Sequence, residues 1–432
     1  MIYNILNTIG SRFLMALISL ILLLLSSNYL GAEGLGSIGL IVLGISIIQL
    51  LNNFVNGGGL IYYTPRFPIL KLFGVAYLWI AITILVFIPI ILFTPLFIKE
   101  YAWDILLLGI ILSAVSTHNH LLLGKEKVKF FNLISLSQSI IQLISLLYLF
   151  FVLDKKSVDS FILSTYISYS ISLVISFLFL VTHLKNKASN QEKVPFFGLF
   201  KKTLNYGFYL QLANIFQLLN YRLSYFLLQF YSGKAAVGIY TPGVQLSEGI
   251  LLPTKSIATV QYARISNMKD DGQAIRLTLA LMKVSFFLTL PILALLMLIP
   301  SDYYTAVLGS DFSQVKQVIA AMSIGIISLS MEGIVSGFFS GTGRQKTNSL
   351  SAFIGFLFTV VLGFYLIPKY GVMGAAYTAT ISYLSMFLFM IFQLNKYAKI
   401  SFKAYLPNSS DIDLVRKELK KLINKSKRSK KR

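Results

Sequence analysis

Six ionisable side chains lie inside long apolar stretches of this sequence, where charge is costly and generally serves a function. Arg222 stands near the middle of the stretch 205–231, too deep for its guanidinium to reach the membrane surface easily. At 100° per residue it shares one helix face with amides and tyrosines, namely Gln211, Asn214, Tyr221, Tyr225 and Gln229. A guanidinium matches phosphate oxygens, and amides and hydroxyls match the donors and acceptors of a sugar. The face therefore predicts a cavity wall for an anionic substrate. The alternative is a structural polar seam in which Arg222 pairs inside the protein.

The other five intramembrane charges are three cations and two carboxylates. Lys255, Arg12 and Lys283 add positive charge for a phosphate group, although Arg12 and Lys283 are close enough to a membrane edge to reach it. Glu248 and Glu332 are predicted to carry a coupling ion or to join a structural network. Lys255 follows Glu248 on the same helix face at a spacing of about 10 Å, so each of the two needs another partner.

Two of the apolar stretches contain residues that weaken a helix. Gly57, Gly58 and Gly59 follow three asparagines inside the stretch 37–62, and Pro253 lies inside the stretch 239–262. Glycine lowers helix propensity, and proline removes a backbone donor. We interpret both places as hinges for alternating access, and bends that serve packing alone are the alternative.

The elements that carry these residues are predicted to be membrane-spanning helices. The chain has 432 residues, of which 56% are hydrophobic and only 12% charged, and a soluble fold needs far more charge to cover its surface. About twelve apolar stretches are long enough to cross a bilayer, and the connections between them are short. We expect an all-α integral membrane protein that is not an enzyme and has no cofactor. Cysteine is absent and His118, His120 and His183 are the only histidines, so no metal site is expected.

The spans are predicted to form two bundles of six helices. The bundles cover residues 1–184 and 203–394, with a cytoplasmic linker at 185–202 and a basic cytoplasmic tail at 395–432. An internal repeat supports this division, because LGAEGLGSIG at 30–39 and SGKAAVGIYT at 232–241 align Gly31 with Gly233 and Gly36 with Gly238. Moving by six spans preserves orientation, so the halves are expected to be related by a pseudo-two-fold axis along the membrane normal. The substrate path is then expected between them.

The net charge of +22 is explained by membrane topology. Lys and Arg concentrate in alternate connections and in the tail, and the positive-inside rule places these segments and both termini in the cytoplasm. No nucleic acid is needed to account for the charge. From Ser409 onward the tail is predicted either as an amphipathic helix on anionic lipid or as a disordered segment.

The opposite connections carry seven acids, which we interpret as solvated loop residues: Glu33, Glu100, Asp104, Asp154, Asp159, Asp302 and Asp311. Serine stripes also follow two spans of the first half, at 135–145 and 164–176. Small polar residues at this spacing are typical of helix packing.

Three segments of the chain resemble a known family. Residues 220–266, beginning NYRLSYFLLQFYSGKAAVGIYTPGVQ, the opening LGAEGLGSIGL, and the stretch from GTGRQKTNSL to Tyr383 are similar to bacterial polysaccharide flippases of the O-antigen type. These belong to the multidrug/oligosaccharidyl-lipid/polysaccharide (MOP) exporter superfamily. The resemblance implies two six-helix bundles around a cavity. It also implies export of undecaprenyl-pyrophosphate-linked oligosaccharide from the cytoplasmic to the periplasmic leaflet of the inner membrane.

Two positions depart from that family. Ser224 stands where an acid is often found, and Ala263 stands where proline is often found. The first departure is expected to leave Arg222 freer to meet an anion. The implied partners are the lipid-linked oligosaccharide, anionic lipids at the tail, and polysaccharide assembly proteins.

Two other functions stay open on the sequence alone. A cation-coupled multidrug exporter of the same superfamily would need buried carboxylates, and only Glu248 and Glu332 lie inside spans. An intramembrane glycan polymerase or ligase would need acid–base groups beside a large outer loop, and every outer connection here is short.

Overall fold

The computed structural model describes residues 2–93, 98–125, 127–183, 194–265, 268, 270–398, 400 and 402–405. These residues form helices and connections without a strand. The α-helices are α1 (Ile2–Asn56), α2 (Gly58–Tyr63), α3 (Ile69–Phe93), α4 (Ala102–Gly124), α5 (Val128–Leu147), α6 (Val158–His183), α7 (Phe196–Gly249), α8 (Leu252–Ile265), α9 (Asp271–Leu298), α10 (Ser301–Leu308), α11 (Val315–Gly341) and α12 (Gln345–Ala398). Short 3-10 helices η1 (Lys99–Tyr101), η3 (Ser310–Phe312) and η4 (Phe402–Tyr405), and a π-helical turn η2 (Tyr148–Val152), complete the described secondary structure.

Three of these helices bend at a glycine and therefore hold two membrane spans each. The bends are at Gly31 in α1 (φ 65°), Gly233 in α7 (φ 80°) and Gly371 in α12 (φ 52°). Only glycine adopts such positive φ values without steric cost. Counting each arm separately, and α8 as the continuation of the second arm of α7, the described helices give the twelve spans that the sequence predicts. Eight helices are long and apolar enough to cross a membrane, and two of these include a bend.

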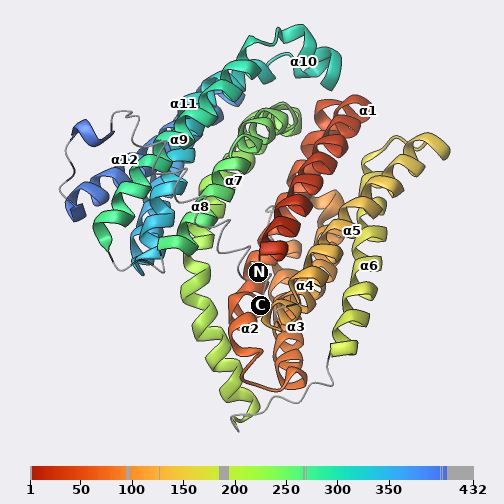
Figure 1. The fold of residues 1–432 in the computed structure, drawn as a ribbon. Coiled ribbons are helices and arrows are strands. Elements are labelled where there is room, and N and C mark those ends of the chain that lie inside the picture. Colours follow the sequence, from red (N-terminus) through yellow and green to blue (C-terminus); the bar gives the residue numbers. More distant parts are fainter. Residues whose placement is uncertain are drawn as a thin grey trace.

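The spans form two groups, the first from α1 to α6 and the second from α7 to α12 (Figure 1). In the first half α4, α5 and α6 pack around α1, and in the second half α11 packs against α8, α9 and α12. The halves meet mainly where α1 lies along α7. Leu228, Val237 and Tyr240 of α7 are buried in the largest apolar cluster, together with Leu35 of α1.

The two ends of the molecule differ in their connections. We call the end with Gly31, Gly233 and Gly371 the kinked end, which is at the top of Figure 1. We call the opposite end, with the connections after α2, α4, α8 and α11, the basic end, because the sequence concentrates Lys and Arg there.

At the kinked end the halves contact each other in matched pairs. A Cβ atom on Gly36 would lie 1.9 Å from the carbonyl oxygen of Lys234, and a Cβ atom on Gly238 would lie 1.7 Å from that of Ala32. Gly31 and Gly233 have the same separation along the sequence as Ala32 and Lys234, and as Gly36 and Gly238. Reciprocal contact of this kind is the signature of a two-fold arrangement. The repeat is therefore a structural one, and its glycines allow the two backbones to touch.

Several predicted boundaries need correction. α7 begins at Phe196, so residues 196–202 belong to a helix and not to the linker, and α12 continues to Ala398. Proline can occupy the first turn of a helix because its missing N–H has no partner there, and α7 begins after Pro195 in this way. Residues 185–193 of the linker and the tail from 406 onward, including its amphipathic segment, lie outside the described residues.

Candidate functional site

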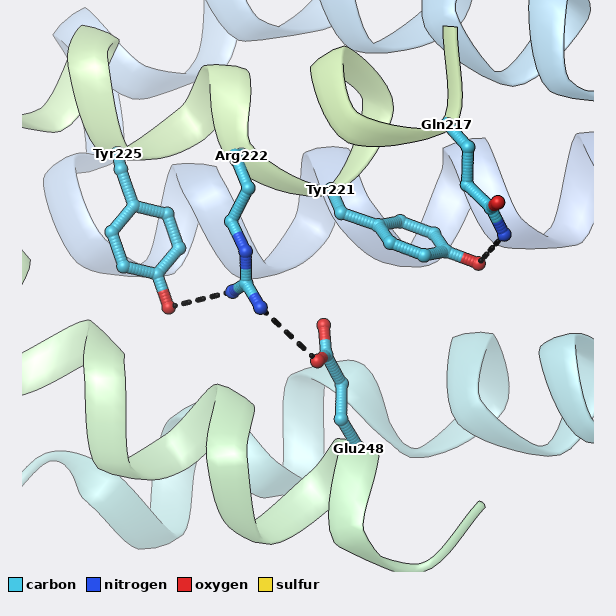
Figure 2. Close-up of polar contacts among 5 residues, drawn as sticks. All are labelled: Gln217, Tyr221, Arg222, Tyr225 and Glu248. Carbon is cyan, nitrogen blue, oxygen red and sulfur yellow. Dashed lines mark hydrogen bonds and ion pairs between the residues drawn. The ribbon is translucent and has the colours of Figure 1, made fainter. Parts of the chain in front are cut away.

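Arg222 lies beside Glu248 in the interior of the second half. The two residues come from the two arms of α7, which the bend at Gly233 folds against each other. Figure 2 shows the guanidinium between two partners: Nη2 is 3.5 Å from Oε2 of Glu248, and Nη1 donates a 3.2 Å hydrogen bond to the Tyr225 hydroxyl. Both charged side chains are partly accessible, at 32% for Arg222 and 21% for Glu248. The expectation that Ser224 leaves Arg222 free is therefore wrong, because Glu248 supplies the carboxylate from another arm.

The ion pair has unused hydrogen-bonding capacity. A guanidinium has five N–H donors, and the contacts with Tyr225 and Glu248 use only part of them. The second oxygen of Glu248, Oε1, is buried and has no hydrogen-bond partner among the described residues. Buried polar atoms generally have partners. A ligand or water with both donors and acceptors would complete this pair.

Tyrosine rings surround the pair. Tyr225 packs edge-on against Tyr240 from the other arm of α7, with ring centroids 5.4 Å apart, and Tyr221 packs edge-on against Tyr383 of α12 at 5.5 Å. Tyr221 also accepts a 3.3 Å hydrogen bond from Gln217 (Figure 2). Aromatic faces and hydroxyls beside a cation are suited to an anionic ligand that carries sugars.

A cavity of about 290 Å³ reaches from Arg222 and Tyr225 into the first half of the molecule. Its walls are mostly apolar side chains of both arms of α1 and of α6, with Gln142, Thr165 and Tyr169 as polar members. Gln142 of α5 donates a 3.1 Å hydrogen bond to Thr165 of α6. Ser26, which is 1% exposed, also lines the cavity, and its hydroxyl has no partner among the described residues. The space therefore lies mainly in the first half.

The other predicted cations do not line this cavity. Arg12 on α1 and Lys255 on α8 are exposed, whereas Lys283 on α9 is only 9% exposed and lies within the second half. Glu332 of α11 is 8% exposed. The structure thus brings Arg222 together with Glu248 and Tyr225, and leaves the other predicted charges at a distance from the cavity wall.

The predicted helix breaks are both present. α1 ends at Asn56 and α2 begins at Gly58, while α7 ends at Gly249 and α8 begins at Leu252 with Pro253 in its first turn. The role of these breaks as hinges stays a prediction.

Gly57 and Gly59 lie against the first arm of α7 at the basic end. A Cβ atom on Gly57 would lie 3.0 Å from Nε2 of Gln211, and one on Gly59 would lie 3.0 Å from Cγ2 of Thr203. Gln211 is buried and accepts a 2.9 Å hydrogen bond from the exposed Asn214. These two amides therefore stand where the halves meet at the basic end, and not beside Arg222.

A buried polar network that the sequence did not point out fixes the first arm of α7. Oδ1 of Asn220 accepts hydrogen bonds from Thr359 and Ser382 of α12, each 2.6 Å long. The Ser382 hydroxyl also lies 2.6 Å from the carbonyl oxygen of Gly355, which competes with Asn220 for its single proton. Asn220 is 2% exposed and lies two residues before Arg222, so this network sets the position of the arginine. The signal in the sequence was an asparagine in the middle of the apolar stretch 205–231.

Two of the histidines, His118 and His120, have structural partners. His118 contacts the Ser176 hydroxyl at 2.8 Å and the Tyr77 hydroxyl at 2.9 Å, and Nδ1 of His120 lies 2.5 Å from the carbonyl oxygen of Asn56. Among the described residues no group of three or more His, Cys, Asp and Glu side chains is arranged to hold a metal ion. The serine stripe of α6 is buried, as packing predicts.

Comparison with known proteins identifies a family. The sequence profile of the family described as "Polysaccharide biosynthesis protein" matches residues 72–317, more than half of the chain. An uncharacterized membrane protein of Methanocaldococcus jannaschii is 24% identical over 237 residues, which cover 54% of this chain and 47% of that protein. The chain thus spans about half the length of the curated relative it matches.

Solved structures share the fold. A multidrug resistance MATE family transporter of the MOP superfamily, in its inward-facing conformation, is similar with a TM-score of 0.69 and 16% identity over 90% of this chain and 96% of that chain. A MOP superfamily transporter from Pyrococcus furiosus, described as having a binding pocket of reverse polarity, is similar with a TM-score of 0.61 and 15% identity over 91% and 95% of the two chains. At these identities the likeness establishes the fold and nothing finer.

Proposed function

Because the chain belongs to the polysaccharide biosynthesis protein family and has the MOP exporter fold, we propose that it is a flippase for lipid-linked oligosaccharides. The proposed substrate is an undecaprenyl-pyrophosphate-linked repeat unit, such as that of O-antigen or another surface polysaccharide. The protein moves it between leaflets by alternating access and makes or breaks no glycosidic bond. It acts in the bacterial inner membrane with both termini in the cytoplasm and with anionic lipids and polysaccharide assembly proteins as partners.

The observation that carries the proposal is the guanidinium of Arg222 at the edge of the cavity. Charge inside a membrane protein is retained where a substrate or ion passes, and a guanidinium binds phosphate oxygens through paired N–H groups. The sugar partners proposed from the sequence, Tyr221 and Tyr225 on the same helix, lie beside it, with Gln211 and Asn214 further towards the basic end.

The ion pair with Glu248 gives a route for binding and release. An incoming pyrophosphate competes with the carboxylate for Arg222, so the pair opens when the substrate enters and closes again when it leaves. The competition keeps the site from holding the anion too tightly, as transport requires. Lys255, Arg12 and Lys283 are proposed to add positive potential at a distance, and Glu332 is the second carboxylate available to a coupling ion.

The test is flipping by the purified protein in liposomes. A fluorescent undecaprenyl-pyrophosphate-linked sugar is placed in both leaflets, and a membrane-impermeant quencher reports the fraction that changes side. We expect protein-dependent flipping of this lipid and none of a neutral isoprenoid that bears the same fluorophore. Equal rates for the two lipids, or no flipping of either, would contradict the proposal.

The same liposomes test the energy source. A pyrophosphate diester carries about two negative charges, and each is worth about 2.3 kcal/mol per 100 mV. Outward movement from an electrically negative cytoplasm is thus favoured by about 4.6 kcal/mol, or about a thousandfold. A potential set with potassium and valinomycin, without proton or sodium gradients, is expected to drive net flipping. If only an ion gradient drives it, Glu248 and Glu332 become the carriers to test.

One observation favours a second candidate, the cation-coupled multidrug exporter. Oε1 of Glu248, for which the described part of the chain provides no partner, offers an acceptor to an organic cation. In that case cationic drugs, and not lipid pyrophosphates, would raise the melting temperature of the purified protein. The Glu248→Gln variant would lose that effect.

A further inference from the structure

Asp311 of the second half binds the backbone of the first half at the kinked end. Its Oδ2 accepts a 3.1 Å hydrogen bond from the amide nitrogen of Ala32. Ala32 is the first residue after the bend at Gly31, and the first N–H groups of a helical arm have no partner within the helix. A carboxylate there also meets the positive end of the helix dipole. Asp311 therefore caps the second arm of α1 from the opposite half.

Glu100 makes the corresponding contact in the other direction. Its Oε2 lies 3.6 Å from Nζ of Lys234, which is the first residue after the bend at Gly233. Glu100 belongs to η1, in the connection between the third and fourth spans, and Asp311 belongs to η3, in the connection between the ninth and tenth. Each half thus extends a carboxylate from the same connection to the residue that follows the glycine bend of the other half.

A third contact strengthens the join between the halves at this end. Nδ2 of Asn28, at the end of the first arm of α1, donates a 2.5 Å hydrogen bond to the carbonyl oxygen of Val307 in α10. The helix α10 and the turn η3 both touch α1. All three contacts lie at the opposite end of the molecule from Gly57 and Gln211. They involve none of the residues proposed to bind the substrate.

The Glu100–Lys234 and Asp311–Ala32 contacts are expected to differ in strength. The Lys234 and Glu100 side chains are 30% and 61% exposed, and exposed ion pairs are weak. The Asp311 hydrogen bond is charge-assisted and stronger. These contacts add to the close packing of the α1 and α7 backbones at the same end, and unlike that packing they can be exchanged for hydrogen bonds with water when the halves part. Two of the seven acids interpreted as solvated are thus placed at a joint between the halves.

We infer that Asp311 and Glu100 are paired clasps that hold the kinked end closed, and that releasing them lets the two halves separate at that end. They act on conformation through Ala32 and Lys234, and not on the substrate. The inference rests on the fold and on these contacts, so it stands whichever substrate the protein carries.

The experiment measures the distance between the halves at both ends. The chain contains no cysteine, so introduced cysteines are the only thiols available for spin labels. Lys155→Cys with Tyr303→Cys reports on the kinked end, where both residues are exposed. Arg66→Cys with Lys346→Cys, also exposed, reports on the basic end. Pulsed electron paramagnetic resonance of the purified protein then gives the populations of near and far distances.

Removing the clasps is expected to shift these populations. Asp311→Ala should raise the ratio of open to closed kinked ends about tenfold, as loss of a charge-assisted hydrogen bond predicts. Glu100→Ala should raise it about twofold, as expected for an exposed pair. Exchange of the charges in Glu100→Lys with Lys234→Glu should restore the closed population. Asp302→Ala is the matched control, because Asp302 is an exposed acid in the same connection as Asp311.

A clasp differs from a residue that only stabilises the fold. If Asp311→Ala lowers the melting temperature but leaves the distances unchanged, or if Asp302→Ala shifts them equally, the inference is wrong. An independent check uses Asn28→Cys with Val307→Cys. Oxidative cross-linking of this pair should be high in the parent and lower in the double clasp variant, and equal yields in both would also overturn the inference. None of these outcomes depends on the substrate, so failure of the proposed function would leave them unaffected.

Discussion

The two halves of the protein have the same arrangement of bent helices but carry different side chains at equivalent positions. α1 and α7 bend at Gly31 (φ 65°) and Gly233 (φ 80°), and Gly36 and Gly238 contact the backbone of the other half in a reciprocal way. By the sequence separation that relates Gly31 to Gly233, Leu20 in α1 is equivalent to Arg222 in α7. The first half therefore has an apolar side chain where the second half has the cation of its ion pair.

The second member of the ion pair also has a neutral counterpart. Ser46 corresponds to Glu248, lines the cavity, and donates a 2.8 Å hydrogen bond to the carbonyl of Val42 in its own helix. The first half therefore has a cavity in this region, whereas the second half has the ion pair between Arg222 and Glu248. The two halves are therefore alike where they meet at the bends, and they differ at the positions of the ion pair.

The largest effect is expected when Arg222 of the second half is replaced by leucine, the residue at the equivalent position of the first half. We expect Arg222→Leu to lower flipping about 10- to 150-fold, the worth of a hydrogen bond to a charged group. Arg222→Lys should restore part of the rate, because an ammonium lacks the planar fork of donors. Lys369→Leu is the control, since Lys369 packs over the Tyr365 ring at the kinked end. Normal flipping by a folded Arg222→Leu protein would remove the arginine from the mechanism.

The reciprocal backbone contacts between the halves are tested by substituting their glycines. Gly36→Ala and Gly238→Ala should each lower the free energy of unfolding by about 1–3 kcal/mol, because the new methyl group overlaps a backbone carbonyl of the other half. Gly333→Ala is the control, since a Cβ atom there has no neighbour within 4 Å. Thermal unfolding in detergent measures all three. A clear difference in the free energy of unfolding between Gly36→Ala and Gly238→Ala would show that the two contacts are not equivalent.

The competition between carboxylate and substrate is tested with Glu248→Ser, the residue of the first half. Freed from its partner, Arg222 should bind an undecaprenyl pyrophosphate more tightly by about tenfold, a change comparable to one net hydrogen bond. The converse variant, Ser46→Glu, adds a carboxylate to the cavity wall and should weaken binding. Equilibrium binding to protein in nanodiscs reports both constants. Weaker binding by Glu248→Ser would show that the glutamate supports the site.

The smallest effect is expected at the helix break of the first half. Gly57→Ala with Gly59→Ala adds methyl groups against Gln211 and Thr203 and stiffens the junction of α1 and α2. Flipping should slow about fivefold, as the difference in helix propensity between glycine and alanine suggests, with binding unchanged. Gly10→Ala, where a Cβ atom meets nothing within 4 Å, controls for loss of a helical glycine. An unchanged flipping rate would assign the glycines to packing alone.

The spans themselves could be predicted from the sequence because each is a local property. A run of apolar residues long enough to cross a bilayer must form a helix there, so span number and approximate bounds followed. The repeat around Gly31 and Gly233 was also visible, since the same steric demand left the same residue at both bends. The third bend, at Gly371, falls between the last two predicted spans, but this glycine was not singled out because its sequence, KYGVMG, has no counterpart in the first half at the spacing considered.

Sequence alone determined that the chain is an all-α membrane protein with a deep arginine on a polar helix face, because hydropathy and helical periodicity act within one segment. Only the tertiary structure decided which charges meet. Spacing along one helix excluded a Glu248–Lys255 pair, but it could not show that the bend at Gly233 would bring Glu248 to Arg222. Nor could it show that Asp311 and Glu100 reach the opposite half, because contacts between distant segments depend on how the arms pack.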